Sequence, residues 1–227
     1  MIDKMKIKGA IFDMDGTLVD SLCFWEYYWQ NLGKKFKGVD DFKPSSDDDR
    51  KCRTMLLKDV VKVIKEGYGF TQSEDELFRF STDFLRQFYQ EIVKEKQGAT
   101  KLLESLKQKG VKICLATATD MGNVKVAIKA TGLEHFFDVV LSCGDIGKGK
   151  DQPDIYLKAI EELGVSPEEA CVFEDSFVAI ETAKSIGVKT VGIYDKYNYG
   201  QDRLKASSDV YLEDGNLEKL ISIIEKG

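Results

Sequence analysis

Short apolar runs alternate with helical patterns over the C-terminal two thirds of the chain. The runs are rich in Val, Ile, Phe and Cys, as strands buried on both faces should be. They cover residues 6–15, 111–117, 138–142, 170–174 and 188–194. Helical segments lie between and after them, at 99–109, 121–131, 153–163, 177–186 and 216–226. Glycine, the usual stop signal, directly follows segments 99–109, 153–163 and 177–186, at Gly110, Gly164 and Gly187. Strand and helix in series predict an α/β fold: a doubly wound, Rossmann-like parallel sheet with helices on both faces.

Residues 18–94 interrupt this alternation. They carry helical periodicity and no convincing strand, with an aromatic-rich stretch at 21–32, a second stretch around 47–65 and a third at 74–95. The third begins with a capping-box pattern of Ser73 and Glu76. We therefore expect an all-helical domain, 18–94, inserted into a discontinuous core made of 1–17 and 95–227.

Composition narrows the classes of partner. The chain has 227 residues, 43% of them apolar, which is enough to bury a sizeable core. Asp and Glu number 39 against 33 Lys and Arg, and no basic tract stands apart from acidic neighbours, so nucleic acid is not an expected partner. No stretch longer than seven residues lacks a charge, and the start of the chain has no apolar signal region, so we expect no membrane association and no export.

The small number of histidines limits the catalytic chemistry open to the chain, and the pattern of cysteines indicates their redox state. With 1 His, the chain cannot assemble a zinc site from several imidazoles, so carboxylates, lysines and hydroxyls must carry any catalysis. The 5 Cys are an odd number without a Cys-x-x-Cys, and Cys114 and Cys171 lie inside apolar runs. We expect buried free thiols in a reducing cytoplasm.

Polar residues follow several of the predicted strands directly. Asp13 and Asp15 end the first run, Thr117 ends the second, and Glu174 and Asp175 end the fourth. Ligands of open parallel sheets bind beyond the carboxyl ends of the strands, where these side chains should converge. The loop 144–150 follows another strand and brings Lys148 and Lys150 to the same edge.

Such an acidic cluster needs a cation, because closely packed carboxylates repel one another and lose hydration. Mg²⁺ prefers hard oxygen ligands and bridges phosphate oxygens. An acidic cluster that binds Mg²⁺, together with Lys and Thr, indicates phosphoryl transfer. Asp13 could act as a nucleophile that forms an aspartyl phosphate, and Asp15 could protonate the leaving oxygen and then activate water.

Four segments together resemble the sequence motifs of the haloacid dehalogenase-like superfamily, in its phosphatase branch. They are Asp13-Met14-Asp15-Gly16-Thr17, the strand ending at Thr117, Lys150 in Lys-Asp-Gln-Pro-Asp, and Phe173-Glu174-Asp175-Ser176. Their order and spacing match over nearly the whole chain. The helical insert resembles the cap domain of the subgroup of phosphoglycolate phosphatases, sugar phosphatases and β-phosphoglucomutases.

The resemblance implies a role for each matching residue. Asp13 is the nucleophile and a Mg²⁺ ligand, Asp15 is the acid/base and gives its backbone carbonyl to the metal, and Asp175 completes the protein ligands, with Glu174 joining directly or through water. Thr117 and the amide of Ala118 hold the phosphoryl group. Lys150, preferred to Lys148 because Pro-Asp follows it, balances the charge of Asp13 and the phosphate.

The resemblance implies a Mg²⁺-dependent phosphatase of a small phosphorylated metabolite, a sugar phosphate being one candidate. A phosphomutase is the alternative within the fold, but the segment Ser-Leu-Cys-Phe-Trp-Glu lacks the cap His of β-phosphoglucomutases. A non-catalytic phospho-acceptor module is the alternative from another class; such modules are about half this length and lack the insert. The sequence leaves the physiological substrate and the oligomeric state open.

Other polar and aromatic residues have structural interpretations. Asp47, Asp48 and Asp49 point about 100° apart in a helix, so they predict a helix start rather than a metal site. Thr117, taken alone, could equally cap the next helix. His135 is expected to be structural or on the surface. Trp25, Tyr28 and Trp29 are expected in the core of the cap, where some of them could also line the substrate cleft.

Overall fold

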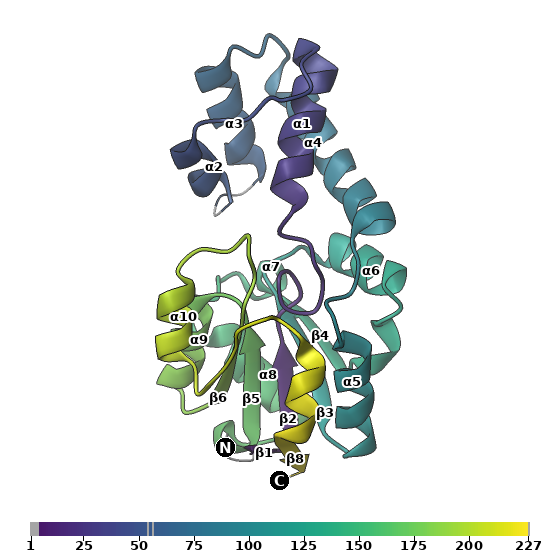
Figure 1. Cartoon of the computed structure of the whole chain (residues 1–227), viewed down its shortest axis with the longest axis vertical. Coiled ribbons are helices and arrows are strands. Elements are labelled where there is room, and N and C mark those ends of the chain that lie inside the picture. The colour runs from purple at the N-terminus through teal and green to yellow at the C-terminus, as the bar shows by residue number, and fades with distance from the viewer. Residues whose placement is uncertain (1–4, 54, 56, 227) are drawn as a thin grey trace. The chain divides into compact units, whose positions relative to one another are not determined.

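A six-stranded parallel sheet organises the larger part of the chain (Figure 1). The computed structural model describes residues 5–53, 55 and 57–226. The strands lie in the spatial order β4-β3-β2-β5-β6-β7 and all neighbours are parallel. Their bounds are β2 Gly9–Phe12, β3 Lys112–Thr117, β4 Val139–Ser142, β5 Ala170–Glu174, β6 Lys189–Ile193 and β7 Val210–Leu212. This confirms the predicted doubly wound α/β fold.

Helices connect the strands of this sheet as the periodicity predicted. The four expected helices are α5 Ala99–Gln108, α6 Met121–Ala130, α8 Asp154–Leu163 and α9 Phe177–Ser185. The structure adds a short helix after β4 and another after β6, together with two 3₁₀ turns. These are α7 Cys143–Ile146, α10 Gln201–Ser207, η2 Glu134–Phe136 and η3 Pro167–Glu169.

The predicted helix at 216–226 is wrong. This segment forms a 3₁₀ turn, η4 Leu217–Ser222, and then a strand, β8 Ile224–Lys226. β8 pairs in parallel with β1 Met5–Ile7, which the apolar run 6–15 had joined to β2. Pairing with a distant strand outweighs local helical periodicity here, because tertiary contacts contribute more to the stability of a short segment than its own propensity does.

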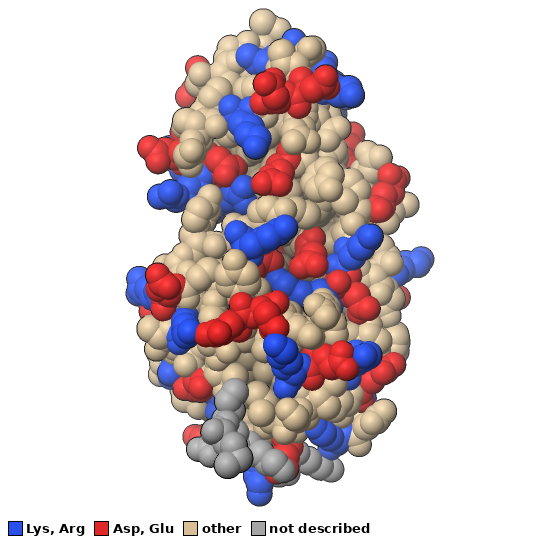
Figure 2. Space-filling model, in the orientation of Figure 1, with Lys and Arg blue, Asp and Glu red and all other residues tan. Residues whose placement is uncertain are grey.

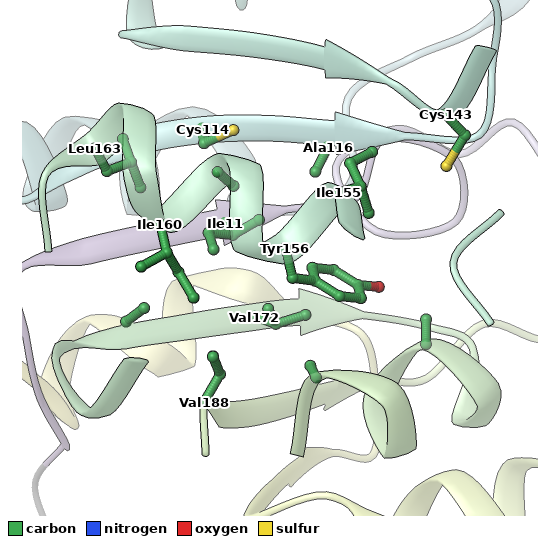
Figure 3. Packing of buried hydrophobic residues seen from close by; sticks show 14 residues of the cluster. Ile11, Cys114, Ala116, Cys143, Ile155, Tyr156, Ile160, Leu163, Val172 and Val188 are labelled. Atoms are coloured by element: carbon green, nitrogen blue, oxygen red, sulfur yellow. The ribbon is translucent and has the colours of Figure 1, made fainter. Parts of the chain in front are cut away.

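A core of small and branched side chains fills one face of the sheet (Figure 3). Ile11, Cys114 and Val172 come from the three central strands, and Ile155 and Ile160 of α8 pack onto them. Alternate residues along the same strands turn to the opposite face, where the rings of Phe12 and Phe173 stack at 4.2 Å. Both faces of the central strands are therefore buried, which explains their continuous apolar runs.

The helical insert forms a compact unit of its own. The chain divides into one unit made of the segments up to Leu22 and from Val93, and a second made of Cys23–Ile92. The second unit contains four helices and a π-helical turn within its described residues. They are α1 Phe24–Lys37, α2 Ser46–Cys52, α3 Leu57–Tyr68, α4 Glu74–Gln87 and η1 Phe88–Ile92.

Aromatic residues form the core of this helical unit. Phe24 lies 5.4 Å, between ring centroids, from both Tyr28 and Phe88, and Tyr28 donates or accepts a hydrogen bond of 2.7 Å with Ser81. Tyr28 and Trp29 are buried and Trp25 is half-buried, as expected of core residues.

The five cysteines are free and form no disulfide, and four of them are buried. These four are Cys52, Cys114, Cys143 and Cys171.

Among the described residues, no helix combines the length and the apolar character needed to cross a membrane. On the face shown in Figure 2, acidic and basic side chains are interspersed, and the described residues form no continuous basic patch there.

Candidate active site

The three central strands end side by side and bring the predicted polar residues to one edge. Phe12, the last residue of β2, is in register with Leu115 of β3 and Phe173 of β5. Asp13 follows β2 at once, and its amide donates to the carbonyl of Phe173 at 3.0 Å. Because the strands are parallel, their carboxyl ends share this edge.

Three buried carboxylates form the centre of the site. Oxygen atoms of Asp13, Glu174 and Asp175 lie within 4.8 Å of one another. The pKa of Asp13 is raised to about 8, chiefly by burial and also by the charge of Glu174, against the opposing effect of Lys150. Burial, followed by the charges of Glu174 and Asp13, raises the pKa of Asp175 well above its usual range, while Lys96 and Asn198 oppose this rise.

Lys150 is the cation that contacts this cluster. Its Nζ donates to Oδ1 of Asp13 and, at 2.5 Å, to Oε1 of Glu174. Burial alone would lower the pKa of Lys150, but the two carboxylates raise it well above its usual value. Lys148 lies instead on the exposed loop, where it donates to Asp154 at 2.8 Å.

Glu174 shares its two carboxylate oxygens between different partners. Oε1 accepts from Lys150, and Oε2 accepts from the backbone amides of Asp175 and Ser176 at 3.0 and 3.1 Å. Glu174 therefore fixes both the ammonium group of Lys150 and the turn that follows β5.

Asp15 lies outside the group of three and has its own partners. Its Oδ1 accepts from the Ser21 hydroxyl at 2.6 Å, and its Oδ2 accepts from the Thr119 hydroxyl at 2.7 Å. Two hydroxyl donors therefore orient the carboxylate. Nothing in the sequence marked Ser21, whereas Thr119 lies two residues beyond Thr117 in the same strand end.

Thr117 ends β3 and is fully buried. Its hydroxyl oxygen accepts from the amide of Thr119 at 3.1 Å. The N-cap of α6 is Asp120, whose side chain accepts from the amide of Asn123, so Thr117 does not cap the next helix. Ala118 follows Thr117 and is exposed at the same edge.

Asp175 has partners that the sequence did not indicate. The side-chain amide of Asn198, beyond β6, donates to Oδ2 of Asp175 at 2.6 Å and to its carbonyl at 3.0 Å. Gly16 also packs closely against this carboxylate: its φ is 79°, and an added Cβ would lie 2.3 Å from Oδ2 of Asp175. Asn198 belongs to no recognisable motif, so only the folded chain brings it to Asp175.

The donor set fits Mg²⁺. Asp13, Glu174 and Asp175 offer carboxylate oxygens, which are the ligands this hard cation prefers. Lys150 is the only lysine or arginine among the described residues that is recorded in an ion pair with one of these three carboxylates. A divalent cation would balance the remaining negative charge, which otherwise makes the buried cluster costly.

The other polar residues singled out in the sequence have local structural roles or lie on the surface. Asp47, Asp48 and Asp49 begin α2, where Ser45 accepts from the amide of Asp48, so the predicted helix start is confirmed. His135 is exposed beside the ring of Phe136, as expected.

Known proteins resemble the chain over most of its length. The model of the family described as haloacid dehalogenase-like hydrolase matches residues 10–193. The chain is 28% identical to the phosphorylated carbohydrates phosphatase of Thermotoga maritima over 89% of this chain and 92% of that protein. It is 28% identical to the pyrophosphatase PpaX of Bacillus mycoides over 83% of this chain and 84% of that protein. A solved structure, a candidate β-phosphoglucomutase of Thermotoga maritima, has a TM-score of 0.83 at 26% identity and covers 95% of this chain and 99% of that chain.

Proposed function

The chain belongs to the haloacid dehalogenase-like hydrolase family and is a phosphatase of that family, and we propose that it hydrolyses a small phosphorylated metabolite through an aspartyl phosphate on Asp13. The observation that carries this proposal is the convergence of Asp13, Glu174, Asp175 and Lys150 at one edge of the sheet. A buried carboxylate beside an ammonium group and two further carboxylates is suited to phosphoryl transfer, where positioning and charge balance dominate catalysis.

In the first step, an oxygen of Asp13 attacks the phosphorus atom of the substrate. A bond forms between this oxygen and phosphorus, and the ester bond between phosphorus and the leaving oxygen breaks. Asp15 donates a proton to the leaving oxygen. The Ser21 and Thr119 hydroxyls orient the Asp15 carboxylate, so the proton is delivered from a fixed direction.

In the second step, water attacks the phosphorus atom of the aspartyl phosphate. A bond forms between the water oxygen and phosphorus, and the bond between phosphorus and the Asp13 oxygen breaks. Asp15, now a carboxylate, accepts the proton of the water, so that inorganic phosphate and the free Asp13 carboxylate result. Throughout both steps, Lys150 offsets negative charge at Asp13 and the phosphoryl oxygens. The hydroxyl of Thr117 and the amide of Ala118 donate to the transferring phosphoryl group.

Asp13, Asp175 and the carbonyl of Asp15 would hold Mg²⁺, and Glu174 would join directly or through water. The bound cation would supply charge balance to the acidic cluster and to the phosphoryl oxygens. The Cys23–Ile92 unit is proposed to act as the cap, whose loop side chains select the leaving group.

Two relatives support the proposed substrate class. One is a phosphatase of phosphorylated carbohydrates, and another is a pyrophosphatase. We propose a sugar phosphate or a comparably small phosphorylated metabolite, with phosphate and the free alcohol as products.

Phosphate release from a panel of sugar phosphates, pyrophosphate and p-nitrophenyl phosphate tests the proposal. The expected result is release that depends on Mg²⁺ in the wild type and is lost in Asp13→Asn. The absence of turnover on the whole panel would contradict it and favour a phospho-acceptor module. Conversion of β-glucose 1-phosphate to the 6-phosphate, with a bisphosphate activator, would instead identify a phosphomutase.

A further inference from the structure

Two buried charges, Lys96 and Asp195, lie outside the four motifs. Their side chains are 7% and 5% exposed, and Nζ of Lys96 lies 2.6 Å from Oδ2 of Asp195. The same Nζ donates to the carbonyl of Gly16 at 2.5 Å. The pair therefore joins the loop that follows β2 to the loop that follows β6.

The loop that carries Asp195 also reaches Asp175. Oδ1 of Asp195 accepts from the amide of Tyr197 at 2.8 Å, and its carbonyl accepts from the amide of Asn198 at 3.2 Å. These bonds shape a turn that presents the side chain of Asn198. From this turn, Asn198 donates to the carboxylate and the carbonyl of Asp175.

The other end of the network is equally constrained. The amide of Lys96 donates to the carbonyl of Leu18 at 2.8 Å, and the amide of Gly16 donates to the carbonyl of Val19 at 2.9 Å. Gly16 follows Asp15 directly and packs against Asp175. Contacts thus run from Gly16 through Lys96, Asp195 and Asn198 to Asp175, and they close on Gly16 again.

Stability alone is a poor explanation for such a pair. The desolvation of two buried charges offsets most of their attraction, and apolar residues of similar volume often stabilise a fold as well. Side chains that orient a metal ligand have a different effect, because their removal weakens metal binding without unfolding the protein.

We propose that Lys96, Asp195 and Asn198 are positioning residues that hold the Gly16 carbonyl and the Asp175 carboxylate in the arrangement needed for metal binding and phosphoryl transfer. This proposal rests on the proposed function and adds three residues from outside its motifs. Lys96 and Asp195 fix the two loops, and Asn198 fixes the rotamer of Asp175.

Two variants interrupt the network at different points. Asn198→Ala removes both hydrogen bonds to Asp175 from a half-buried turn. The double variant Lys96→Met/Asp195→Asn removes both charges together, so that no unpaired charge is left buried, and it retains an acceptor for the amide of Tyr197. Asn31→Ala is the matched control, because the side chain of Asn31 is exposed on α1 and, among the described residues, donates to the carbonyl of Tyr27 in the same helix.

The measurements are the dissociation constant for Mg²⁺ alone by calorimetry, the melting temperature, and kcat and KM on p-nitrophenyl phosphate. We expect each variant to weaken Mg²⁺ binding roughly 10- to 100-fold and to lower kcat more than it raises KM. The melting temperature should stay close to that of the wild type, and Asn31→Ala should match the wild type in all readouts.

Folded variants that bind Mg²⁺ with wild-type affinity would overturn the positioning role. Loss of Mg²⁺ affinity that merely follows loss of melting temperature would also overturn it, because it would reveal a structural pair. A wild type that neither binds Mg²⁺ nor releases phosphate would overturn the proposed function itself. The two failures are therefore distinguishable.

Discussion

Lys150 and Lys148 are two lysines of one loop with different surroundings. Lys150 contacts Asp13 and Glu174 in a mostly buried position, whereas Lys148 pairs with Asp154 on the surface. Lys150→Met removes the charge but keeps the aliphatic stem. We predict that it lowers kcat by roughly 10²-fold or more, because a preorganised charge at the phosphoryl group is lost. Initial rates of phosphate release at saturating substrate measure this.

Lys148→Met is the matched control for that variant. Its kcat should stay within about twofold of the wild type, since exposed ion pairs contribute little. Equal losses in the two variants would contradict the assignment of the cationic role to Lys150.

Substitutions at Gly16 and Gly38 distinguish the effect of backbone strain from the effect of a close contact at the site. Both have a positive φ, 79° and 68°, but an added Cβ at Gly16 meets Asp175, whereas at Gly38 it meets nothing within 4 Å. We predict that Gly16→Ala abolishes Mg²⁺ binding and turnover, because it displaces the Asp175 carboxylate. Calorimetry with Mg²⁺ and steady-state kinetics check this.

Gly38→Ala carries the same kind of backbone strain without the contact. Its free energy of unfolding should fall by about 1–2 kcal/mol, the cost of a left-handed backbone for a residue with a Cβ, with activity unchanged. Wild-type kinetics in a folded Gly16→Ala would show that Asp175 does not depend on this glycine.

At the scale of elements, Asp209 ties the start of β6 to the segment before β7. Its Oδ2 accepts from the amide and hydroxyl of Thr190 at 2.8 and 3.0 Å, and its Oδ1 pairs with Lys184 at 2.9 Å. Burial alone would raise the pKa of Asp209, but these donors lower it. The pKa of Asp209 is lower in the folded state than in the unfolded state. Its carboxylate therefore adds stability at pH values above about 3.9, the usual pKa of Asp, and this stability is lost as the pH falls through the folded-state pKa.

We predict that Asp209→Asn lowers the free energy of unfolding by about 1 kcal/mol at pH 7, since the exposed pair with Lys184 is screened by solvent. The difference from the wild type should disappear as the pH falls below about 4. Urea titrations at several pH values measure it, and Asp41→Asn, on the exposed surface of the helical unit, is the control. A difference that persists at acid pH would contradict the electrostatic origin.

The sequence predicts the elements that local patterns determine and misses those that depend on distant partners. The five buried strand runs and the helices between them follow from apolar periodicity and from glycine stops. Segment 216–226 does not, because its outcome depends on pairing with β1. β7, Val210–Leu212, has three residues, of which two are half-buried and one is buried, so it is too short for its pattern to be distinguished from a loop.

The same contrast between local patterns and distant partners separates the site residues that the sequence predicts from those that it misses. Asp13, Thr117 and Glu174 stand at strand ends, so topology brings them together before any coordinates are known. Lys96 and Asn198 join segments far apart in the chain, and neither lies in a pattern that marks a contact.

At the scale of the whole molecule, the formal net charge of -6 is partly concentrated in one buried group of acids at the carboxyl edge of the sheet. Elsewhere, on the face shown in Figure 2, acidic and basic side chains are interspersed. In the proposed function, this local group of acids prepares a site for a cation and a phosphoryl group.

The central claim is that Asp13 takes up the phosphoryl group. Acid quenching during turnover, followed by peptide mass spectrometry, tests it most directly. We predict a phosphorylated peptide containing Asp13 that forms and decays with turnover in the wild type and is absent from Asp13→Asn. Turnover in Asp13→Asn at the wild-type rate, or a phosphoryl group found on another residue, would contradict the account.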